Sequence, residues 1–385
     1  MKTSDFDYDL PQELIAQEPA AVRDACRMLV MDRKTGALED RIFRDIEEYL
    51  NPGDLLVANE TRVLPARLLG AKRGTGGAAE VFLLREVKGE AAARYIDESA
   101  TSSANQQAIW EVLVRPGKRL KPGSGAIVDF TDANGEVALS AEVVDWASAK
   151  PDADNAEDGA AKGERVARLT TTLPSLDEAL HAVGHTPLPP YIKNYAGDEE
   201  MYQTVYSRNE GSAAAPTAGL HFTPELIEQL KSKGVNWETV DLEVGLDTFR
   251  VVDEDDPLQH KMHTEFYSVP QRTVDAINET HAKGGRVIAV GTTSTRSLES
   301  AWDVEADGGK GALVARNRAT TNLFLYPGKE FHVIDGLITN FHVPRSTLMM
   351  LVSAFSSREN IMAAYQHAIE ERYRLLSFGD AMFLH

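Results

Sequence analysis

The chain has 385 residues, of which 43% are hydrophobic and 26% charged, a balance typical of globular proteins that excludes a disordered or collagen-like chain. Its single cysteine, Cys26, excludes an intrachain disulfide and a cysteine-based structural zinc site, and it favours a reducing, cytoplasmic compartment. The net charge of −19 argues against non-specific nucleic-acid binding, which needs a basic surface, although it does not exclude a local basic patch.

The N-terminal part of the chain predicts two strands with a short helix between them. Apolar runs at residues 28–32 and 54–58 are typical of buried strands. Residues 43–50 have the pattern of a helix that ends before Asn51-Pro52-Gly53, a strong turn signal.

The following region differs, because its apolar runs are short, several of them alternate with polar residues, and turn residues separate them. This pattern predicts a small antiparallel β-barrel. Two interruptions, the Ala/Ser-rich segment 89–107 and the Asp/Ala-rich segment 147–163, are expected to be surface loops. The predicted strands are residues 66–69, 80–85, 110–114, 126–130, 137–144 and 166–170.

From residue 213 onward, strands and helices alternate, which is typical of an α/β layer with largely parallel strands. One helix begins at the N-cap Thr223, with a proline in its first turn, and ends at Gly234. We therefore predict an α/β domain built from residues 1–61 and 182–385, with the barrel, residues 62–181, inserted into it. The other expected elements are strands at 240–244, 286–290 and 335–341 and helices at 270–284, 294–302, 346–355 and 360–375.

The segment APTAGLHFT, residues 215–223, leads into that helix start and is a candidate ligand loop. Small residues around Thr217 and Gly219 allow the backbone to approach a ligand closely, and His221 at the junction could titrate near neutrality. Phe222 follows it. The same residues also suit an ordinary loop with a buried histidine.

The segment VGTTSTR, residues 290–296, lies at another strand-to-helix junction, where α/β sheets bind ligands. Its hydroxyl groups and Arg296 suit a carboxylate or ribose hydroxyls, with Gly291, Thr292 and Thr293 nearest the strand end. It is neither a P-loop nor a dinucleotide-binding GxGxxG motif. A well-capped helix start is the structural alternative.

Three further motifs carry chemistry. HKMHTE, residues 260–265, has two imidazoles and a carboxylate, but its spacing matches no common zinc motif, so we favour acid–base or substrate contact by His263 and Glu265 over a metal. The other candidates are polar or aromatic groups that could read or stack on a base, or hold a ribose hydroxyl. They are Asn340, Phe341 and His342 at a third junction, and Asp380 in SFGDAM.

Basic residues cluster in the predicted barrel. The segment RPGKRLK holds Arg115, Lys118, Arg119 and Lys121, and such a turn could hold phosphates, or be a solvated turn only. Arg62, at the start of the barrel, is added to this candidate set.

Several segments together resemble one family. APTAGLHFT, VGLDTFR, HKMHTE, GTTSTRSLES, TNFHVPRSTLMMLVSAF and SFGDAMF, in this order, closely resemble the S-adenosylmethionine:tRNA ribosyltransferase-isomerase family of queuosine biosynthesis. FDYDLPQELIAQEPA, DRKTG, PGDLLVANETRVLPARL and MYQTVYS are similar to the same family. The resemblance covers the chain outside the two loops and residues near 304–316.

The resemblance implies an enzyme that transfers the ribosyl part of S-adenosylmethionine to 7-aminomethyl-7-deazaguanine at the tRNA wobble position. The ribose is isomerised to an epoxycyclopentane, giving epoxyqueuosine, and adenine and methionine leave. It also implies an α/β part with an inserted barrel. The partners would be this tRNA and S-adenosylmethionine as cosubstrate, with no metal and no tightly held cofactor, and we expect a monomer.

The chemistry that the resemblance implies needs a base, an acid for adenine and tight positioning. His221, His263, Glu265 and His342 are the candidate acid–base groups, in no order. Thr292, Thr293 and Arg296 could hold the methionine carboxylate or ribose, and Phe222 or Phe341 could stack on a base. The remaining substrate-binding candidates are Thr217, Gly219, Gly291, Asn340 and Asp380.

The chain departs from the family at Glu243, where the family usually has histidine, and at Val251, where it has proline. Two alternatives stay open: a non-catalytic tRNA-binding protein, and an enzyme acting on free nucleosides. A membrane partner is not expected, because there is no signal-peptide pattern and the longest strongly apolar stretch, residues 348–355, is far shorter than the about 20 residues that cross a bilayer.

Overall fold

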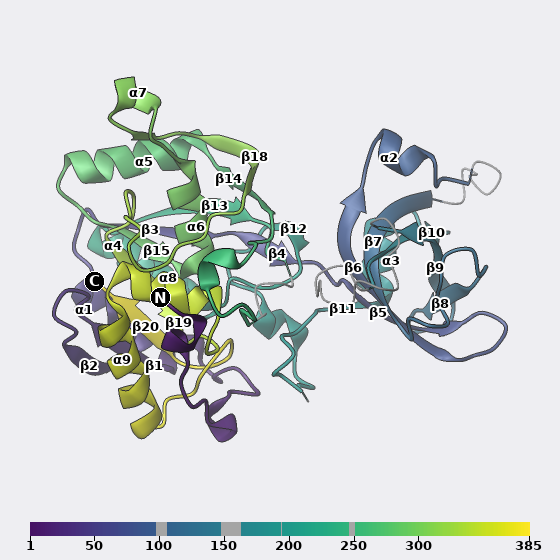
Figure 1. The fold of residues 1–385 in the computed structure, drawn as a ribbon, viewed down its shortest axis with the longest axis horizontal. Coiled ribbons are helices and arrows are strands. Elements are labelled where there is room, and N and C mark those ends of the chain that lie inside the picture. The colour runs from purple at the N-terminus through teal and green to yellow at the C-terminus, as the bar shows by residue number, and fades with distance from the viewer. Residues whose placement is uncertain (98–105, 148–162, 194, 246–250) are drawn as a thin grey trace. The chain divides into compact units, whose positions relative to one another are not determined.

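The chain forms two compact units, Met1–Arg62 with Leu188–His385 (the α/β unit), and Val63–Pro187 (the barrel unit) (Figure 1). Both chain ends belong to the α/β unit, so the predicted class, an α/β part with an inserted barrel, is confirmed. The expected boundary after residue 181 falls inside helix α3 (Leu176–Val183), which packs on barrel strands, and the barrel unit therefore extends to Pro187. The computed structural model describes residues 1–97, 106–147, 163–193, 195–245 and 251–385.

The α/β unit is built on a nine-stranded sheet with the order β18-β14-β13-β3-β15-β19-β20-β1-β2. Its centre is parallel: β3 pairs in parallel with β13 and β15, and β15 with β19. Towards the edges the pairing is antiparallel except between β20 and β1, so the expected largely parallel sheet is found only in the centre. The strands are β1 (Arg27–Met31), β2 (Leu38–Ile42), β3 (Leu55–Asn59), β13 (Asn236–Leu242), β14 (Glu265–Val269), β15 (Val287–Val290), β18 (Arg316–Thr321), β19 (Gly336–Asn340) and β20 (Ala381–Leu384).

Both faces of this sheet are apolar, because its buried strands are continuous hydrophobic runs whose side chains alternate between two layers. In β3, Leu55 and Val57 enter one apolar cluster, and Leu56 and Ala58 enter the other. Helices α5, α6, α8 and α9 contribute to the first layer, and α1 and α4 to the second. The sheet is therefore the middle of a three-layer structure.

The helices begin and end largely where the sequence predicts. In α4 the hydroxyl of Thr223 accepts from the Leu226 amide at 3.1 Å, and Gly234 ends the helix at φ 94°. The hydroxyl of Ser346 caps α8 in the same way, because it accepts a hydrogen bond from the Met349 amide at 3.2 Å. The helices are α1 (Ile46–Tyr49), α4 (Pro224–Lys233), α5 (Gln271–Ala282), α6 (Gly291–Ala301), α7 (Ala306–Gly309), α8 (Thr347–Phe355) and α9 (Arg358–Glu370).

The barrel unit is a closed, antiparallel barrel of six strands in the order β5-β6-β7-β10-β9-β8, closed by pairing of β8 with β5. Its core is made by inward-facing residues of the alternating strands, among them Leu68, Val81 and Leu169. The six predicted strands are confirmed. The unit contains β5 (Arg67–Lys72), β6 (Ala78–Val87), α2 (Glu90–Ala93), β7 (Gln106–Arg115), β8 (Ile127–Thr131), β9 (Val137–Trp146), β10 (Arg165–Thr171), α3 and β11 (Gly184–His185).

Parts of the two expected surface loops, residues 98–105 and 148–162, lie outside the described residues, as do residues 246–250 of the VGLDTFR motif. Among the described residues no helix is long and apolar enough to span a membrane. The remaining short strands are β4 (Thr61–Val63), β12 (Asn209–Ser212), β16 (Trp302–Asp303) and β17 (Ala312–Leu313).

Candidate active site

A cavity of about 600 Å³, open space at its mouth included, lies in the α/β unit and is called cavity 1. It is found where the parallel strands β13, β15 and β19 end, which is where α/β sheets bind ligands. Four of the sequence motifs meet here, although they are far apart along the chain. Its described lining is Tyr191, residues 214–218, Val244, residues 291–293, residues 339–343, Leu348, Leu376 and Ser377.

Asn340 is the centre of a buried hydrogen-bond network beside cavity 1. Its Oδ1 accepts from the hydroxyl of Thr217 at 3.0 Å, and its Nδ2 lies 3.1 Å from Nε2 of His221. The other imidazole nitrogen, Nδ1, lies 3.1 Å from Sγ of Cys26. Burial, with the charges of Arg23 and Arg374, lowers the pKa of His221 to about 3, so the expectation that it titrates near neutrality is wrong.

His342 lies on the wall of cavity 1 and is the only imidazole there among the described residues. Its Nε2 lies 3.0 Å from the hydroxyl of Thr339. The backbone is held as well, because its amide donates to the Tyr365 hydroxyl and its carbonyl accepts from Tyr8, at 2.8 and 2.6 Å. Burial lowers the pKa of His342 to about 3, so the side chain is neutral at physiological pH.

The hydroxyl groups of the VGTTSTR motif divide into two sets. Ser294 and Thr295 donate to carbonyl groups one turn back, at 2.8 and 3.1 Å, and are fully buried, so they serve the helix. Thr292 and Thr293 line cavity 1 beside Gly291, whose φ of 92° suits glycine. The Thr293 hydroxyl is buried and has no hydrogen-bond partner within the described parts of the chain, which leaves it open to a ligand.

The HKMHTE motif meets α6, which begins within the VGTTSTR motif, in a second, smaller cavity of about 300 Å³, open space at its mouth included, called cavity 2. Glu265 accepts from Nη1 of Arg296, from the Gly245 amide at 3.1 Å, and lies 3.0 Å from Nε2 of His263. Burial would raise the pKa of Glu265, but the contacts with His263 and Arg296 outweigh it, and the pKa is lowered. Glu265 is thus an ionised partner of Arg296 and not a free base. His260 instead lies 3.0 Å from Glu254.

Three other candidate residues, Phe222, Gly219 and Asp380, contact the protein's own core or backbone. Phe222 has no exposed surface and packs between Phe43 and Trp237, so it offers no face for stacking. A Cβ at Gly219 would lie 1.9 Å from the Tyr206 hydroxyl. The space left by the missing side chain is therefore filled by Tyr206 and not by a ligand.

Asp380 is buried and is not among the described lining of cavity 1, and its two oxygens accept from the amides of Arg27 and Arg374 at 2.9 and 2.7 Å, so it holds the backbone of two segments together. Phe341 is different, because it lines cavity 1 although only 1% of it is exposed.

Sequence reasoning missed three polar residues of cavity 1: Thr339, Tyr191 and Ser377. The hydroxyls of Tyr191 and Ser377 lie 2.7 Å apart. Ser377 belongs to the SFGDAM motif. Its hydroxyl, two residues before a glycine, was the feature of the sequence that could have marked it as a binding residue. Tyr191 lies in no recognisable local pattern, and only the fold brings it to the cavity.

In the barrel unit, the side chains of Arg115, Lys118, Arg119 and Lys121 are exposed, and none has an ion-pair partner among the described residues. Four other barrel arginines, at positions 67, 73, 85 and 168, form ion pairs with acidic side chains. The four residues are therefore a local basic surface, called the basic turn.

Arg62 is not part of the basic turn. It belongs to the α/β unit, where it forms ion pairs with Glu200 at 2.5 Å and with Glu210 at 3.6 Å.

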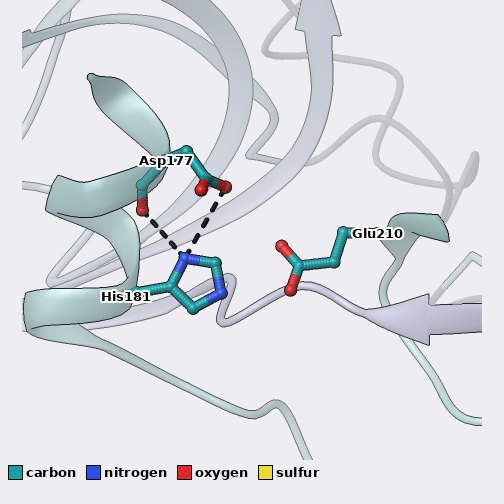
Figure 2. A group of neighbouring side chains, drawn as sticks. All are labelled: Asp177, His181 and Glu210. Carbon is teal, nitrogen blue, oxygen red and sulfur yellow. Dashed lines mark hydrogen bonds and ion pairs between the residues drawn. The ribbon is translucent and has the colours of Figure 1, made fainter. Parts of the chain in front are cut away.

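On α3 of the barrel unit, Nδ1 of His181 lies 2.9 Å from the carbonyl and 3.6 Å from a carboxylate oxygen of Asp177 (Figure 2). This i,i+4 pair is a local helix contact.

Comparison with known proteins identifies the family. The family model described as queuosine biosynthesis protein matches residues 3–384. Proteins named S-adenosylmethionine:tRNA ribosyltransferase-isomerase from Acetivibrio thermocellus and Caldanaerobacter subterraneus are 48% and 46% identical over 384 residues, which is 100% of each chain. The crystal structure of S-adenosylmethionine tRNA ribosyltransferase from Thermotoga maritima is 36% identical, with a TM-score of 0.50 over 99% of this chain and 100% of that one. The chain therefore belongs to the queuosine biosynthesis protein family of S-adenosylmethionine:tRNA ribosyltransferase-isomerases.

Proposed function

We propose that this chain transfers and isomerises the ribosyl part of S-adenosylmethionine onto 7-aminomethyl-7-deazaguanine at the wobble position of tRNA. The product is epoxyqueuosine in tRNA, and adenine and methionine leave. Family membership supports the proposal, and one observation in the fold carries it: four separated motifs meet in cavity 1. A protein that only bound tRNA would not need hydroxyl, amide and imidazole groups from separate motifs gathered in one cavity.

The cavity provides what the reaction needs. The positive sulfonium acidifies the adjacent ribose carbon, so a positioned base can remove that proton and so drive the loss of adenine. His342 is the neutral imidazole on the cavity wall, and the Thr339 hydroxyl orients its ring. We assign it the role of proton acceptor because it lines the cavity and His221 does not; its lowered pKa makes it a weak base, so the acidity of the carbon next to the sulfonium must supply much of the driving force. The substrate amine is the nucleophile, so no covalent nucleophile from the protein is required.

The remaining polar groups of the cavity suit positioning. The hydroxyls of Thr292, Thr293 and Ser377 and the amide of Asn340 come from three separate segments of the chain. The buried Thr293 hydroxyl has no hydrogen-bond partner among the residues that the structure describes. Hydroxyl donors of this kind suit ribose, whereas Phe341, only 1% exposed and packed against Tyr365 and Tyr373, offers little face for stacking. S-adenosylmethionine acts here as a cosubstrate, without a metal or tightly held cofactor.

The basic turn is proposed as a contact for tRNA phosphates. Four cations on one turn, without ion-pair partners among the described residues, provide the local positive surface that the net charge of −19 does not suggest. Acidic residues concentrate elsewhere, for example at residues 253–256. Recognition would then depend on a splayed-out base and the shape of the anticodon loop. We further propose that the protein acts in the cytoplasm as a monomer.

Adenine release tests the proposal. The protein is incubated with S-adenosylmethionine and one of three acceptors: tRNA carrying the deazaguanine, the free deazaguanine base, or tRNA without it. We expect adenine only with the first. Adenine with the free base would favour an enzyme of free nucleosides, and tRNA binding without adenine in any arm would favour a binding protein.

A further inference from the structure

Among the described residues, Nη2 of Arg296 is a buried donor without an acceptor in the interior of the α/β unit. Its side chain is only 7% exposed, Nη1 pairs with Glu265, and Nε donates to the Leu323 carbonyl at 3.4 Å. Its Nη2 is buried and has no hydrogen-bond partner within the described ranges. A buried charged donor without a partner is unfavourable, so an acceptor from a ligand would stabilise this arrangement.

The surroundings of Arg296 define what that acceptor is. Arg296 lines cavity 2, and the other walls include the apolar side chains of Met262, Leu325 and Leu351. Glu265, the buried carboxylate beside it, already has both oxygens engaged, by Arg296 on one side and by Gly245 and His263 on the other. The free guanidinium edge therefore suits an anionic oxygen, and the walls suit a short apolar chain attached to it.

Cavity 2 adjoins cavity 1. Arg296 follows Thr292 and Thr293 by four and three residues on α6, so it lies about one helical turn, ~5.4 Å, further along the same helix face. Leu348 lines both cavities. A ligand whose ribose lies against the threonines of cavity 1 could extend an arm along α6 into cavity 2.

We propose that cavity 2 is the subsite for the amino-acid end of the sulfonium substrate, with its carboxylate held by Nη2 of Arg296. This inference rests on the proposed function, which supplies S-adenosylmethionine as the ligand. Glu265 is then a positioning residue: it holds Nη1 and so turns the other edge of the guanidinium to the ligand. His263 supports Glu265 in the same role.

The test compares two ligands that differ only in the proposed contact: S-adenosylmethionine and its decarboxylated form. Because one buried charge-assisted contact is at stake, we expect the unmodified protein to bind the decarboxylated form roughly tenfold to hundredfold more weakly, by equilibrium dialysis and by KM. Equal affinity for both ligands would overturn the proposal without any variant.

A variant pair locates the contact. In Arg296→Met/Glu265→Gln, which removes both buried charges together, the preference for the carboxylate should disappear. In the matched control Glu265→Gln, Arg296 remains and most of the preference should remain. Circular dichroism and thermal unfolding check that both are folded. If the double variant weakens both ligands equally, Arg296 is only structural and the proposal fails.

The same experiment separates the two proposals. Dialysis reads the carboxylate preference without turnover. A protein that binds S-adenosylmethionine with this preference but releases no adenine would contradict the proposed function and support the subsite. A protein that releases adenine equally well from both ligands would support the function and contradict the subsite.

Discussion

The amide of Asn340 donates a hydrogen bond from Nδ2 to Nε2 of His221 over 3.1 Å, and this contact fixes the tautomer of a buried imidazole. Because Nε2 accepts, the proton is on Nδ1, which faces Sγ of Cys26 at 3.1 Å. The orientation of the Asn340 amide is set in turn by the Thr217 hydroxyl, which donates to Oδ1. His221 therefore positions Asn340 at the wall of cavity 1 and does not exchange protons with substrate.

We predict that His221→Gln and His221→Leu separate positioning from proton transfer. Glutamine can accept from Asn340, whereas leucine leaves a buried amide unsatisfied, at a cost of about 1–3 kcal/mol in the free energy of unfolding. Activity should fall more in the leucine variant than in the glutamine variant, while the pH at half-maximal kcat stays unchanged in both. A shift of that pH in the glutamine variant would show that His221 titrates during turnover.

Acid should destabilise the protein between about pH 6.5 and pH 3. Burial lowers the pKa of His221 and of His342 from 6.5 to about 3, so in this window the unfolded chain binds protons that the folded protein does not. The free energy of unfolding therefore falls as the pH falls, by about 2 kcal/mol for each histidine at pH 5. Urea unfolding at pH 7 and pH 5 measures the loss, and His221→Gln should lose about 2 kcal/mol less than the unmodified protein. An equal loss in both would contradict the assignment.

His342→Gln should lower kcat by about 10²–10⁴-fold, the usual contribution of a general base, with little change in the KM for S-adenosylmethionine. Thr339→Val, which removes only the hydroxyl that orients the ring, is the graded control and should lower kcat less. Single-turnover adenine release measures the chemical step directly. Full turnover by His342→Gln would remove this residue from the mechanism.

Neutralising the basic turn should weaken tRNA binding and leave the small-molecule site intact. Lys118→Gln/Lys121→Gln should raise the KM for tRNA roughly tenfold and make it less dependent on salt, because fewer phosphate contacts remain. The KM for S-adenosylmethionine should not change. The charge-matched control is Lys231→Gln/Lys283→Gln, which removes two exposed lysines of the α/β unit. Equal effects of the two pairs on tRNA would show a general charge effect and no specific contact.

Local patterns were sufficient to predict much of the fold. The barrel strands alternate clearly, and α4 has a capping threonine and a terminating glycine, so both follow from short-range chemistry. The antiparallel edges of the large sheet could not be predicted, because the pairing of β19 with β20 is set by tertiary contacts between distant segments. The boundary at the end of the barrel unit differs from the predicted one for the same reason. The sequence of α3 predicts an amphipathic helix but does not show which of the two units this helix packs on.

The site was predicted in part. Motif positions correctly marked the strand ends, yet residue type alone did not reveal which side chains face the cavity. Asp380 and Phe222 have suitable chemistry but are used by the backbone and the core. The pairing of Glu265 with Arg296, 31 residues later, follows from the sheet and helix arrangement and from no local spacing.

The mass of the wobble nucleoside tests the central claim most directly. tRNA carrying 7-aminomethyl-7-deazaguanine is incubated with S-adenosylmethionine and the full-length protein, then digested to nucleosides and analysed by mass spectrometry. We predict that the deazaguanine nucleoside gains the mass of the epoxycyclopentane unit in step with the adenine released. An unchanged nucleoside mass, with a folded protein and a related enzyme active in the same mixture, would contradict the assignment of this chain as a ribosyltransferase-isomerase.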